Sequence, residues 1–439
     1  MSAFTAEQAA AFRIMRQHLA DVRSAEAVAL RTNERHSAEA VALRTNERRS
    51  PEAVALRKKE GRSVSAERPS AQADARSAKA SAERRAASTE PLADVVRDTA
   101  GIQSQVMSAA EMSMWTRRQS TTRVEIQRAL WDTRDLVRTS AMRLTLHVIP
   151  ARDFAIYIEA LKPMALVTLQ RWHARVGAKP GEVRGLIDTV VDSLCDQGPQ
   201  TQQELIARVR RKAGKGVRTW LDHAWSAIRP AVIDGAIVYG PPRGAEATFI
   251  HTDGWLGPQP RLSTDEARAE LMRRFLSAFG PASPHDFARW SGLKTTEAKA
   301  ILTAIERDVQ EVDVDGARGW ALRSDVAAIA SSRIEPDAVR LLPAFDSFLL
   351  AHATKEHLVE RRFYERVYRP QGWISPTVLQ RGRVIGVWFQ QAAGRNVTLD
   401  VQLFKRARPH VREAIAAEAD ALGIFLGRRC TPRFTTTPG

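Results

Sequence analysis

The stretch EVRGLIDTVVDSLCDQGPQTQQELIARVRRKAGKGVRTWLDHAWSAIRPAVIDGAIVYGPPRGAEATFIH, residues 182–251, decides the fold. Its apolar spacing predicts a helix to about Asp196, a GPQT turn, a helix from Gln202 and a longer helix around Trp220. Two short runs, AIVYG and ATFIH, then predict strands joined by the loop PPRG. Helices followed by a two-stranded wing are typical of a winged-helix unit.

The same order of elements recurs downstream. DEARAELMRRFLSAFG predicts a helix, Ser283 and Pro284 begin a second, TTEAKAILTAIE is a third, and QEVDVDGARGWALR is a hairpin. After Leu341 the stretches LLPAFDSFLLA, GWISPTVLQRGRVIGVWFQ and NVTLDVQLF predict strands, followed by the helix PHVREAIAAEADALG and a final strand IFLG. We therefore expect a mainly α chain with small β elements (α+β), in which tandem winged-helix domains precede a C-terminal β-rich domain.

Upstream of these units lies a short connector between two expected helices. TEPLADVVRDTAG predicts the first helix, and IQSQV follows it without helical signal. Ser108 and Glu111 then form an S-x-x-E capping box, which predicts the start of the next helix. Gln103 and Gln105 thus lie in the connector, where side chains two residues apart project to the same side of an extended segment.

Residues 23–88 differ in composition from the rest of the chain. EAVAL recurs there with a period of 13 from Glu26, Glu39 and Glu52, so its apolar positions move around a helix and form no lasting stripe. We expect a mostly disordered insert, for which a flexible DNA-binding arm and an expanded repeat without a role are both open. The expected domains are the N-terminal helix of the first winged-helix unit (1–22), the insert (23–88), the first unit with the glutamines (89–178), the second (179–260), the third (261–335) and the β-rich domain (336–439).

The charge balance favours a polyanionic partner. The net charge is +16, which points to nucleic acid, here double-stranded DNA, as the leading polyanionic partner, and a basic excess that only maintains solubility is the alternative. No stretch approaches 18 apolar residues and no secretory signal is visible, and two cysteines fit a reduced cytoplasmic protein. His352 and His357, five apart, would diverge on a helix, so no metal site is expected. Without a dimerisation heptad we expect a monomer.

Several separated blocks resemble the AlkZ-like (YcaQ-like) winged-helix DNA glycosylases. They are GIQSQVMSAAEMSMWTR, LVRTSAMRLTLHVIPARDF, FLSAFGPASPHDFARWSGL, LLPAFDSFLLAHATKEHL and YRPQGWISPTVLQRGRVIGVW. Together with TAEQAAAFRIMRQHL at the start, they cover nearly all of the chain outside the insert. The resemblance implies hydrolysis of the N-glycosidic bond of alkylated purines in DNA, with a place at the nucleoid. Some members of the family open interstrand cross-links and protect antibiotic producers from their own DNA-alkylating products.

The family's Gln-Φ-Gln motif, in which Φ is aliphatic, falls on Gln103, Ser104 and Gln105, with serine in the aliphatic position. The resemblance implies that the two glutamines are catalytic and that the HVIP block, with His147, helps to form the lesion pocket. On the residues alone, a purely structural role for the two amides and for His147 is also open. Expected DNA contacts are His147, Arg143, Arg243 and Arg369, whereas Trp373 is expected in the core.

Neutral amides suit this chemistry. Alkylation at N7 or N3 leaves the purine positively charged, so the leaving group needs no strong general acid, in contrast to ordinary glycoside hydrolysis. A glutamine oxygen can accept from a water and face an oxocarbenium-like sugar, while a second amide fixes the first. No metal or organic cofactor is expected. The rival hypothesis is a non-catalytic winged-helix DNA-binding protein, a regulator or lesion sensor, which would usually need dimer symmetry.

Overall fold

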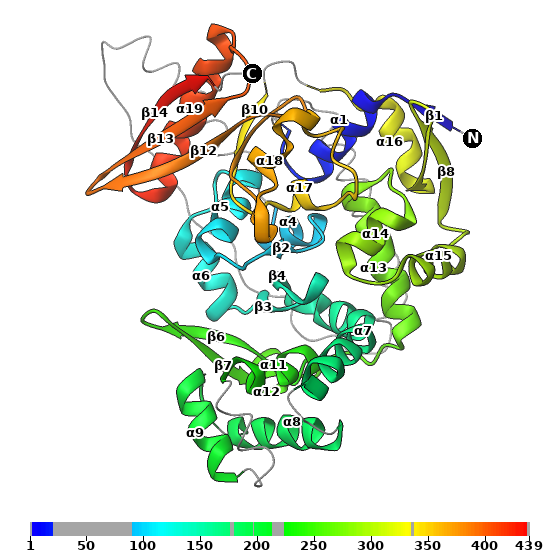
Figure 1. Ribbon diagram of the computed structural model, residues 1–439, viewed down its shortest axis with the longest axis vertical. Coiled ribbons are helices and arrows are strands. Elements are labelled where there is room, and N and C mark those ends of the chain that lie inside the picture. Colours follow the sequence, from blue (N-terminus) through cyan, green and yellow to red (C-terminus); the bar gives the residue numbers. More distant parts are fainter. Residues whose placement is uncertain are drawn as a thin grey trace, which may run out of the picture. The chain divides into compact units, whose positions relative to one another are not determined.

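The computed structural model describes residues 2–20, 90–175, 180–195, 197–212, 224–334 and 338–436. The predicted insert and the helix predicted around Trp220 lie outside these residues. Contacts join residues 2–20 with the chain from Glu90 onward in one compact unit, whose elements are labelled in Figure 1. Within the described residues, no helix is long and apolar enough to cross a bilayer.

The first segment packs helices against both faces of three short strands. Its elements are α4 (Leu92–Asp98), β2 (Ile102–Gln103), α5 (Met107–Arg117), α6 (Arg123–Trp131), β3 (Leu136–Ser140), η1 (Met142–Leu144), β4 (Leu146–Pro150), η2 (Ala151–Asp153) and α7 (Phe154–Arg175). Val96, Ile102, Met114, Ile126 and Val148 share one apolar core. Burial of such side chains is the main force that holds the connector against the sheet.

The second segment extends the sheet of the first. Its elements are α8 (Pro180–Leu194), β5 (Gln200–Thr201), α9 (Gln202–Lys212), α11 (Ala224–Asp234), β6 (Ile237–Arg243), β7 (Glu246–His251) and α12 (Thr252–Leu256). Leu186, Val190, Leu205 and Phe249 pack together beneath the predicted β6–β7 hairpin. Because β6 pairs with β3 at Tyr239, the strands form one sheet in the order β2-β4-β3-β6-β7-β5.

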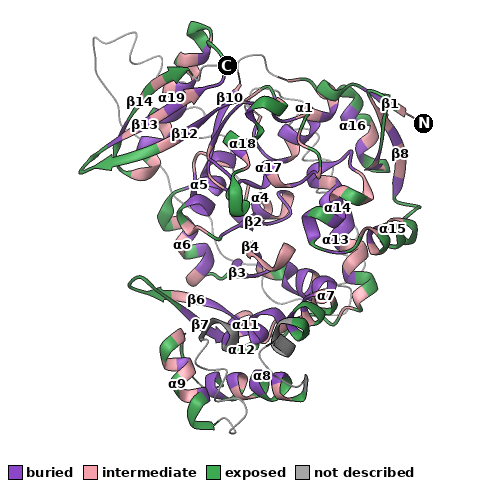
Figure 2. Cartoon of the chain, viewed as in Figure 1, coloured by how far each residue is buried: buried purple, intermediate pink, exposed green. Residues whose placement is uncertain are grey.

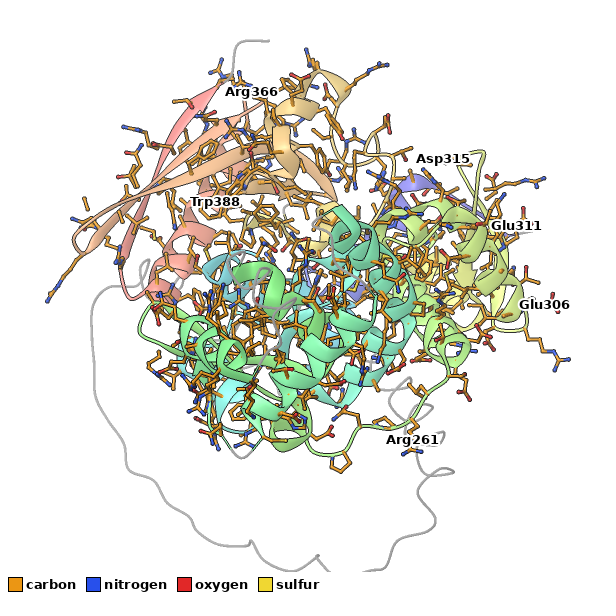
Figure 3. All side chains as sticks on the ribbon, turned by 60° about the horizontal axis from the view of Figure 1, so that its bottom comes forward. Arg261, Glu306, Glu311, Asp315, Arg366 and Trp388 are labelled. Atoms are coloured by element: carbon orange, nitrogen blue, oxygen red, sulfur yellow. The ribbon has the colours of Figure 1, made fainter. Side chains whose placement is uncertain are left out.

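The third segment repeats helices followed by a hairpin. Its elements are α13 (Thr264–Phe279), α14 (Pro284–Ser291), α15 (Thr295–Ala304), β8 (Val309–Val314), β9 (Ala317–Leu322), η3 (Arg323–Asp325) and α16 (Val326–Ser331). The Ser283 hydroxyl accepts from the N–H of Asp286, so α14 begins where the sequence predicts. Figure 3 shows Glu306, Glu311 and Asp315 projecting from one edge of this segment.

The N-terminal residues contact the third segment directly. β1 (Ser2–Phe4) pairs in parallel with β8, and α1 (Ala6–Arg16) packs on α13 and α16. The sequence assigns residues 1–22 to the first unit, and His18, two residues after the end of α1, contacts that unit through a hydrogen bond between its Nε2 and Asp98 Oδ2, 3.0 Å long. The domain bounds themselves stay a prediction.

The C-terminal segment is a five-stranded sheet with one long helix. Its elements are β10 (Val339–Leu342), α17 (Ser347–Leu350), η4 (Arg361–Phe363), α18 (Tyr364–Val367), η5 (Pro370–Gly372), β11 (Thr377–Gln380), β12 (Arg383–Ala393), β13 (Asn396–Leu403), α19 (Pro409–Leu426) and β14 (Arg429–Thr436). The strand order is β10-β11-β12-β13-β14, antiparallel except for the parallel pair β13–β14 that α19 connects. Trp388 is buried and donates its indole N–H to Leu342 O over 3.0 Å (Figure 3).

The α+β class is confirmed, but three local predictions are wrong. Helix α5 begins after Val106 without a side-chain cap, because Glu111 is buried and accepts from Gln127 Nε2 instead. The strand predicted in LLPAFDSFLLA ends at Leu342, since Asp346 caps the short helix α17. IFLG is the end of α19, and the last strand is β14.

Candidate active site

The connector that carries the two glutamines forms the edge of the sheet. β2 pairs with β4, so that Ile102 lies opposite Val148 and Gln103 opposite His147. Gly101 has φ +89°, and a Cβ there would lie 3.1 Å from Ile149 Cγ2, so only glycine fits this turn without strain. Figure 2 shows that these strands and the adjacent helices α4 and α5 are largely buried. The backbone of the connector is therefore fixed.

Gln103 is buried and held by an arginine. Its side chain is 8% exposed, and its Oε1 accepts from Arg143 Nη2 over 2.9 Å. Arg143 has φ 55° and also donates to the backbone oxygen of Trp290. A Cβ on Gly292, which has φ +93°, would lie 3.2 Å from Arg143 Cα, so a glycine there permits this close approach. The amide of Gln103 cannot flip without losing a charge-assisted hydrogen bond.

Gln105 is the exposed member of the pair. β2 pairing ends just before it, where Ser104 N donates to Leu146 O over 2.7 Å. Gln105 Oε1 accepts from the N–H of Leu146 over 3.3 Å, and its amide NH₂ has no partner within the described part of the chain. A carbonyl-type oxygen has a second lone pair, so Gln105 retains both an acceptor and two donors for a ligand.

Ser104 occupies the inward position between the glutamines. It is fully buried, and its hydroxyl has no hydrogen-bond partner among the residues described. Its backbone oxygen accepts from Arg138 Nη2 over 2.9 Å, and the Arg138 guanidinium lies 4.9 Å from the centre of the Tyr239 ring. An apolar side chain would satisfy this position better than a hydroxyl.

His147 is a neutral residue in this site. It is 2% exposed, and burial, followed by the charge of Arg143, lowers its pKa to about 3. His147 Nδ1 lies 3.0 Å from Thr145 O, and because a carbonyl only accepts, Nδ1 carries the proton and Nε2 is an acceptor. Burial, followed by the charge of Arg289, lowers the pKa of Arg143 to about 10, so Arg143 stays charged at neutral pH.

The structure brings Gln103, His147 and Arg143 together, but the other two expected DNA contacts lie elsewhere. Arg243, at the end of β6, is exposed and donates to Glu204 Oε1 over 2.5 Å and to Pro199 O over 2.9 Å, both in the second segment. Arg369 is exposed beside η5, and no described residue forms an ion pair with its side chain.

Trp373 is not a core residue, contrary to the prediction. It is 45% exposed, with its ring centre 4.8 Å from that of Phe345 in an edge contact. Gln371 and Gly372 have φ of 62° and 76°, and this left-handed turn directs the chain outward before Trp373. Stacked rings of Tyr364 and Tyr368, 4.8 Å apart, lie in the same segment.

The C-terminal segment supports the connector through residues that sequence reasoning missed. Ser347 Oγ donates to Gly101 O over 3.0 Å. Asp346 accepts from Arg117 with both oxygens over 2.8 Å and from Ser113 Oγ over 2.8 Å, in full burial. Burial raises the pKa of Asp346, but the Arg117 charge and the hydrogen bonds that the carboxylate accepts together keep this pKa below its usual value. The FDS sequence within one of the resemblance blocks is the signal that could have found them.

Other polar clusters lie away from the glutamines. A cavity of about 1070 Å³ is lined by parts of α1, the β8–β9 hairpin and residues 352–363 and 404–411, but by none of the connector residues. His352 and His357, expected to diverge, have ring centres 4.8 Å apart because residues 352–357 are not helical.

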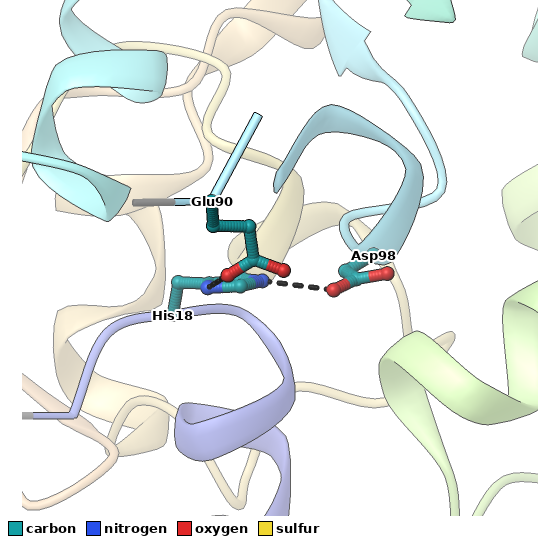
Figure 4. Close-up of side chains that lie close together, drawn as sticks. All are labelled: His18, Glu90 and Asp98. Atoms are coloured by element: carbon teal, nitrogen blue, oxygen red, sulfur yellow. Dashed lines mark hydrogen bonds and ion pairs between the residues drawn. The ribbon is translucent and has the colours of Figure 1, made fainter. Parts of the chain in front are cut away.

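Among the described residues, one group of three side chains of the kinds that bind metals lies close together: His18, Glu90 and Asp98 (Figure 4). His18 Nδ1 lies 3.5 Å from Glu90 Oε2, and Nε2 lies 3.0 Å from Asp98 Oδ2. Both ring nitrogens thus face carboxylates. Through His18, the N-terminal residues 2–20 thus contact Glu90 and Asp98 in the chain that follows residue 89.

Comparisons with known proteins identify the family and the fold. A family model described as DNA glycosylase AlkZ-like matches residues 96–425. The chain is 32% identical over 315 residues, 68% of this chain and 82% of the relative, to the interstrand DNA cross-link repair glycosylase of Streptomyces sahachiroi. The solved structure of Streptomyces sahachiroi DNA glycosylase AlkZ has the same fold, with a TM-score of 0.74 and 24% identity over 99% of this chain and 100% of that one. The chain therefore belongs to the AlkZ-like family of DNA glycosylases.

Proposed function

We propose that this glycosylase hydrolyses the N-glycosidic bond of bulky or cross-linked N-alkylpurines of the N7-alkylguanine type, in DNA repair or in self-resistance to a genotoxic alkylating product. The observation that carries the proposal is the pair of amides on one rigid connector. Gln103 is locked by Arg143, and Gln105 is exposed with a free NH₂ group. The related Streptomyces protein is named a cross-link repair glycosylase, which supports the lesion class.

The amides act by position rather than by proton transfer. The second lone pair of Gln105 Oε1 accepts from the attacking water and presents partial negative charge to the developing sugar cation. Gln103, held by Arg143, keeps the connector and the water site in one geometry. His147, neutral at physiological pH, offers Nε2 as a further acceptor. The cationic purine leaves without a general acid, which fits the absence of a carboxylate from the connector.

Binding to the rest of the duplex is proposed to use the two helix–hairpin segments, 179–260 and 261–335, as tandem winged helices. Arg243 at the β6–β7 tip is the proposed phosphate contact, and on binding it exchanges Glu204 for the phosphate. Arg369 is exposed and unpaired within the described chain, so it is available without such an exchange. The protein is proposed to act as a monomer.

The test is base release from a duplex that carries one N7-alkylguanine. The protein should liberate the modified base and leave an abasic site that breaks on heating with alkali, whereas undamaged duplex should stay intact. Tight binding of the lesion duplex without any base release would instead support the non-catalytic lesion sensor.

A further inference from the structure

Arg143, which holds Gln103, packs against the helix that carries a second arginine, Arg289. Arg143 contacts Gln103 Oε1 over 2.9 Å and the backbone oxygen of Trp290 on α14. Arg289 precedes Trp290 on that helix and is exposed, and no described residue forms an ion pair with it. The close packing of Gly292 against Arg143 fixes the end of α14 at this place.

A third cation, Lys355, lies in a part of the C-terminal segment that is bonded to α14. Lys355 is half-buried and donates Nζ to Leu349 O over 2.9 Å and to His352 O. Its segment is tied to α14 because Ala353 N donates to Asp286 Oδ1 over 2.7 Å. Backbone oxygens thus hold the ammonium group, its nitrogen lies 5.3 Å from the centre of the Tyr368 ring, and no described carboxylate forms an ion pair with it.

The three charges act on one another. Burial lowers the pKa of Lys355 to about 7, with further lowering by Arg143 and Arg289, while Asp286 raises it. Asp286 is already engaged, since its oxygens also accept from Ser283 N over 2.8 Å and Ser283 Oγ over 2.6 Å. Like charges held close together in partial burial cost free energy until an anion joins them.

We propose that Arg143, Arg289 and Lys355 together bind one backbone phosphate next to the lesion nucleotide. The inference rests on the proposed function and adds Arg289 and Lys355 to the residues that it uses. A phosphate lies on each side of the sugar whose bond breaks, so a phosphate is the anion that reaches Gln103 with the substrate. Guanidinium and ammonium groups hold it by charge-assisted hydrogen bonds. Anchoring this phosphate fixes the sugar relative to Gln105.

Binding to duplexes with a tetrahydrofuran abasic analogue tests the site without catalysis. Neutral methylphosphonates replace the phosphates around the analogue one at a time, and affinity is measured for wild type and Arg289→Ala. One position should weaken wild-type binding about 10- to 100-fold, as expected for the loss of a charge-assisted contact. Arg289→Ala should weaken binding to the all-phosphate duplex, and neutralising that position should then weaken its binding by a smaller factor than it weakens wild-type binding, because Arg143 and Lys355 still contact the phosphate. Arg289→Lys should retain most of the affinity.

Arg318→Ala is the matched control, because this exposed arginine on β9 pairs with Glu311 and lies outside the cluster. The loss of affinity that Arg318→Ala causes should multiply with the loss caused by the methylphosphonate, as expected for independent sites. Two results would overturn the phosphate site. In one, the loss of affinity caused by Arg289→Ala multiplies with the loss caused by the methylphosphonate at every position; in the other, no methylphosphonate weakens wild-type binding. These readouts do not need base release, so an absence of excision by wild type would overturn the proposed function separately.

Discussion

Replacing Gln103 and Arg143 singly and together tests whether the arginine acts through the amide. The bond between Arg143 Nη2 and Gln103 Oε1 is 2.9 Å long and lies in a site where Gln103 is 8% exposed, so water cannot replace the donor freely. A hydrogen bond to a charged group contributes about 1.5–3 kcal/mol, or roughly 10- to 100-fold in rate when it acts through orientation. We therefore expect Gln103→Ala and Arg143→Ala each to slow excision about 100-fold, and the double variant to be no slower than the slower of the two.

The assay is single-turnover excision of N7-alkylguanine at saturating enzyme, which removes any contribution of Arg143 to affinity. Thermal denaturation checks that each variant is folded. A double variant about 10⁴-fold slower than wild type, the product of the single effects, would refute the idea that the two residues form one unit. Gln103→Ala combined with Arg243→Ala serves as the control, because Arg243 contacts only the second segment in the described structure, and that combination should be additive.

Three further outcomes are expected. Ser104→Ala should raise the free energy of unfolding by about 1 kcal/mol in urea titration, because it removes a buried hydroxyl without a described partner; a fall would show that the hydroxyl is bonded. Deletion of residues 23–88 should leave cooperative unfolding and excision intact, because His18 and Glu90, on the two sides of the deleted stretch, already lie in contact, 3.5 Å between ring nitrogen and carboxylate oxygen. Loss of cooperative unfolding in the deletion variant would place the insert in the core. The pKa of Lys355 is about 7 in the folded protein and near the ordinary 10.5 in the unfolded chain, so between these values the unfolded chain binds more protons. The free energy of unfolding should therefore rise from pH 7 to 9, and it should rise more in wild type than in Lys355→Met. Affinity of wild type for the abasic-analogue duplex should fall from pH 7 to 9, because the phosphate binds the charged form of the Lys355 amine.

The sequence predicts elements well where local signals and packing agree. Ser283, Pro284 and Asp286 form a cap that needs no distant partner, and α14 begins there. The β6–β7 hairpin follows from alternating apolar runs around a Pro/Gly turn. The box at Ser108 and Glu111 fails because tertiary contacts of Glu111, an ion pair with Arg123 and a bond from Gln127, compete with capping.

The site could be predicted only in part, for the same physical reason. Gln103 and Gln105 stand out because they lie in one short connector, and pairing with β4 then brings His147 opposite Gln103. Arg289 and Lys355 come within electrostatic range of Arg143 through the packing of α14 and of the C-terminal segment, and no local pattern in the sequence reports such tertiary proximity.

The most direct test of the account is excision by the glutamine variants beside an affinity measurement. Gln105→Ala should release N7-alkylguanine about 10²–10³-fold more slowly than wild type, and Gln103→Ala to a similar or lesser degree, with nearly unchanged affinity for the lesion duplex. Gln105→Glu should retain partial activity, because the carboxylate keeps an acceptor toward the water and the sugar cation. If both alanine variants excise at the wild-type rate, the amides are structural and the proposed mechanism is wrong.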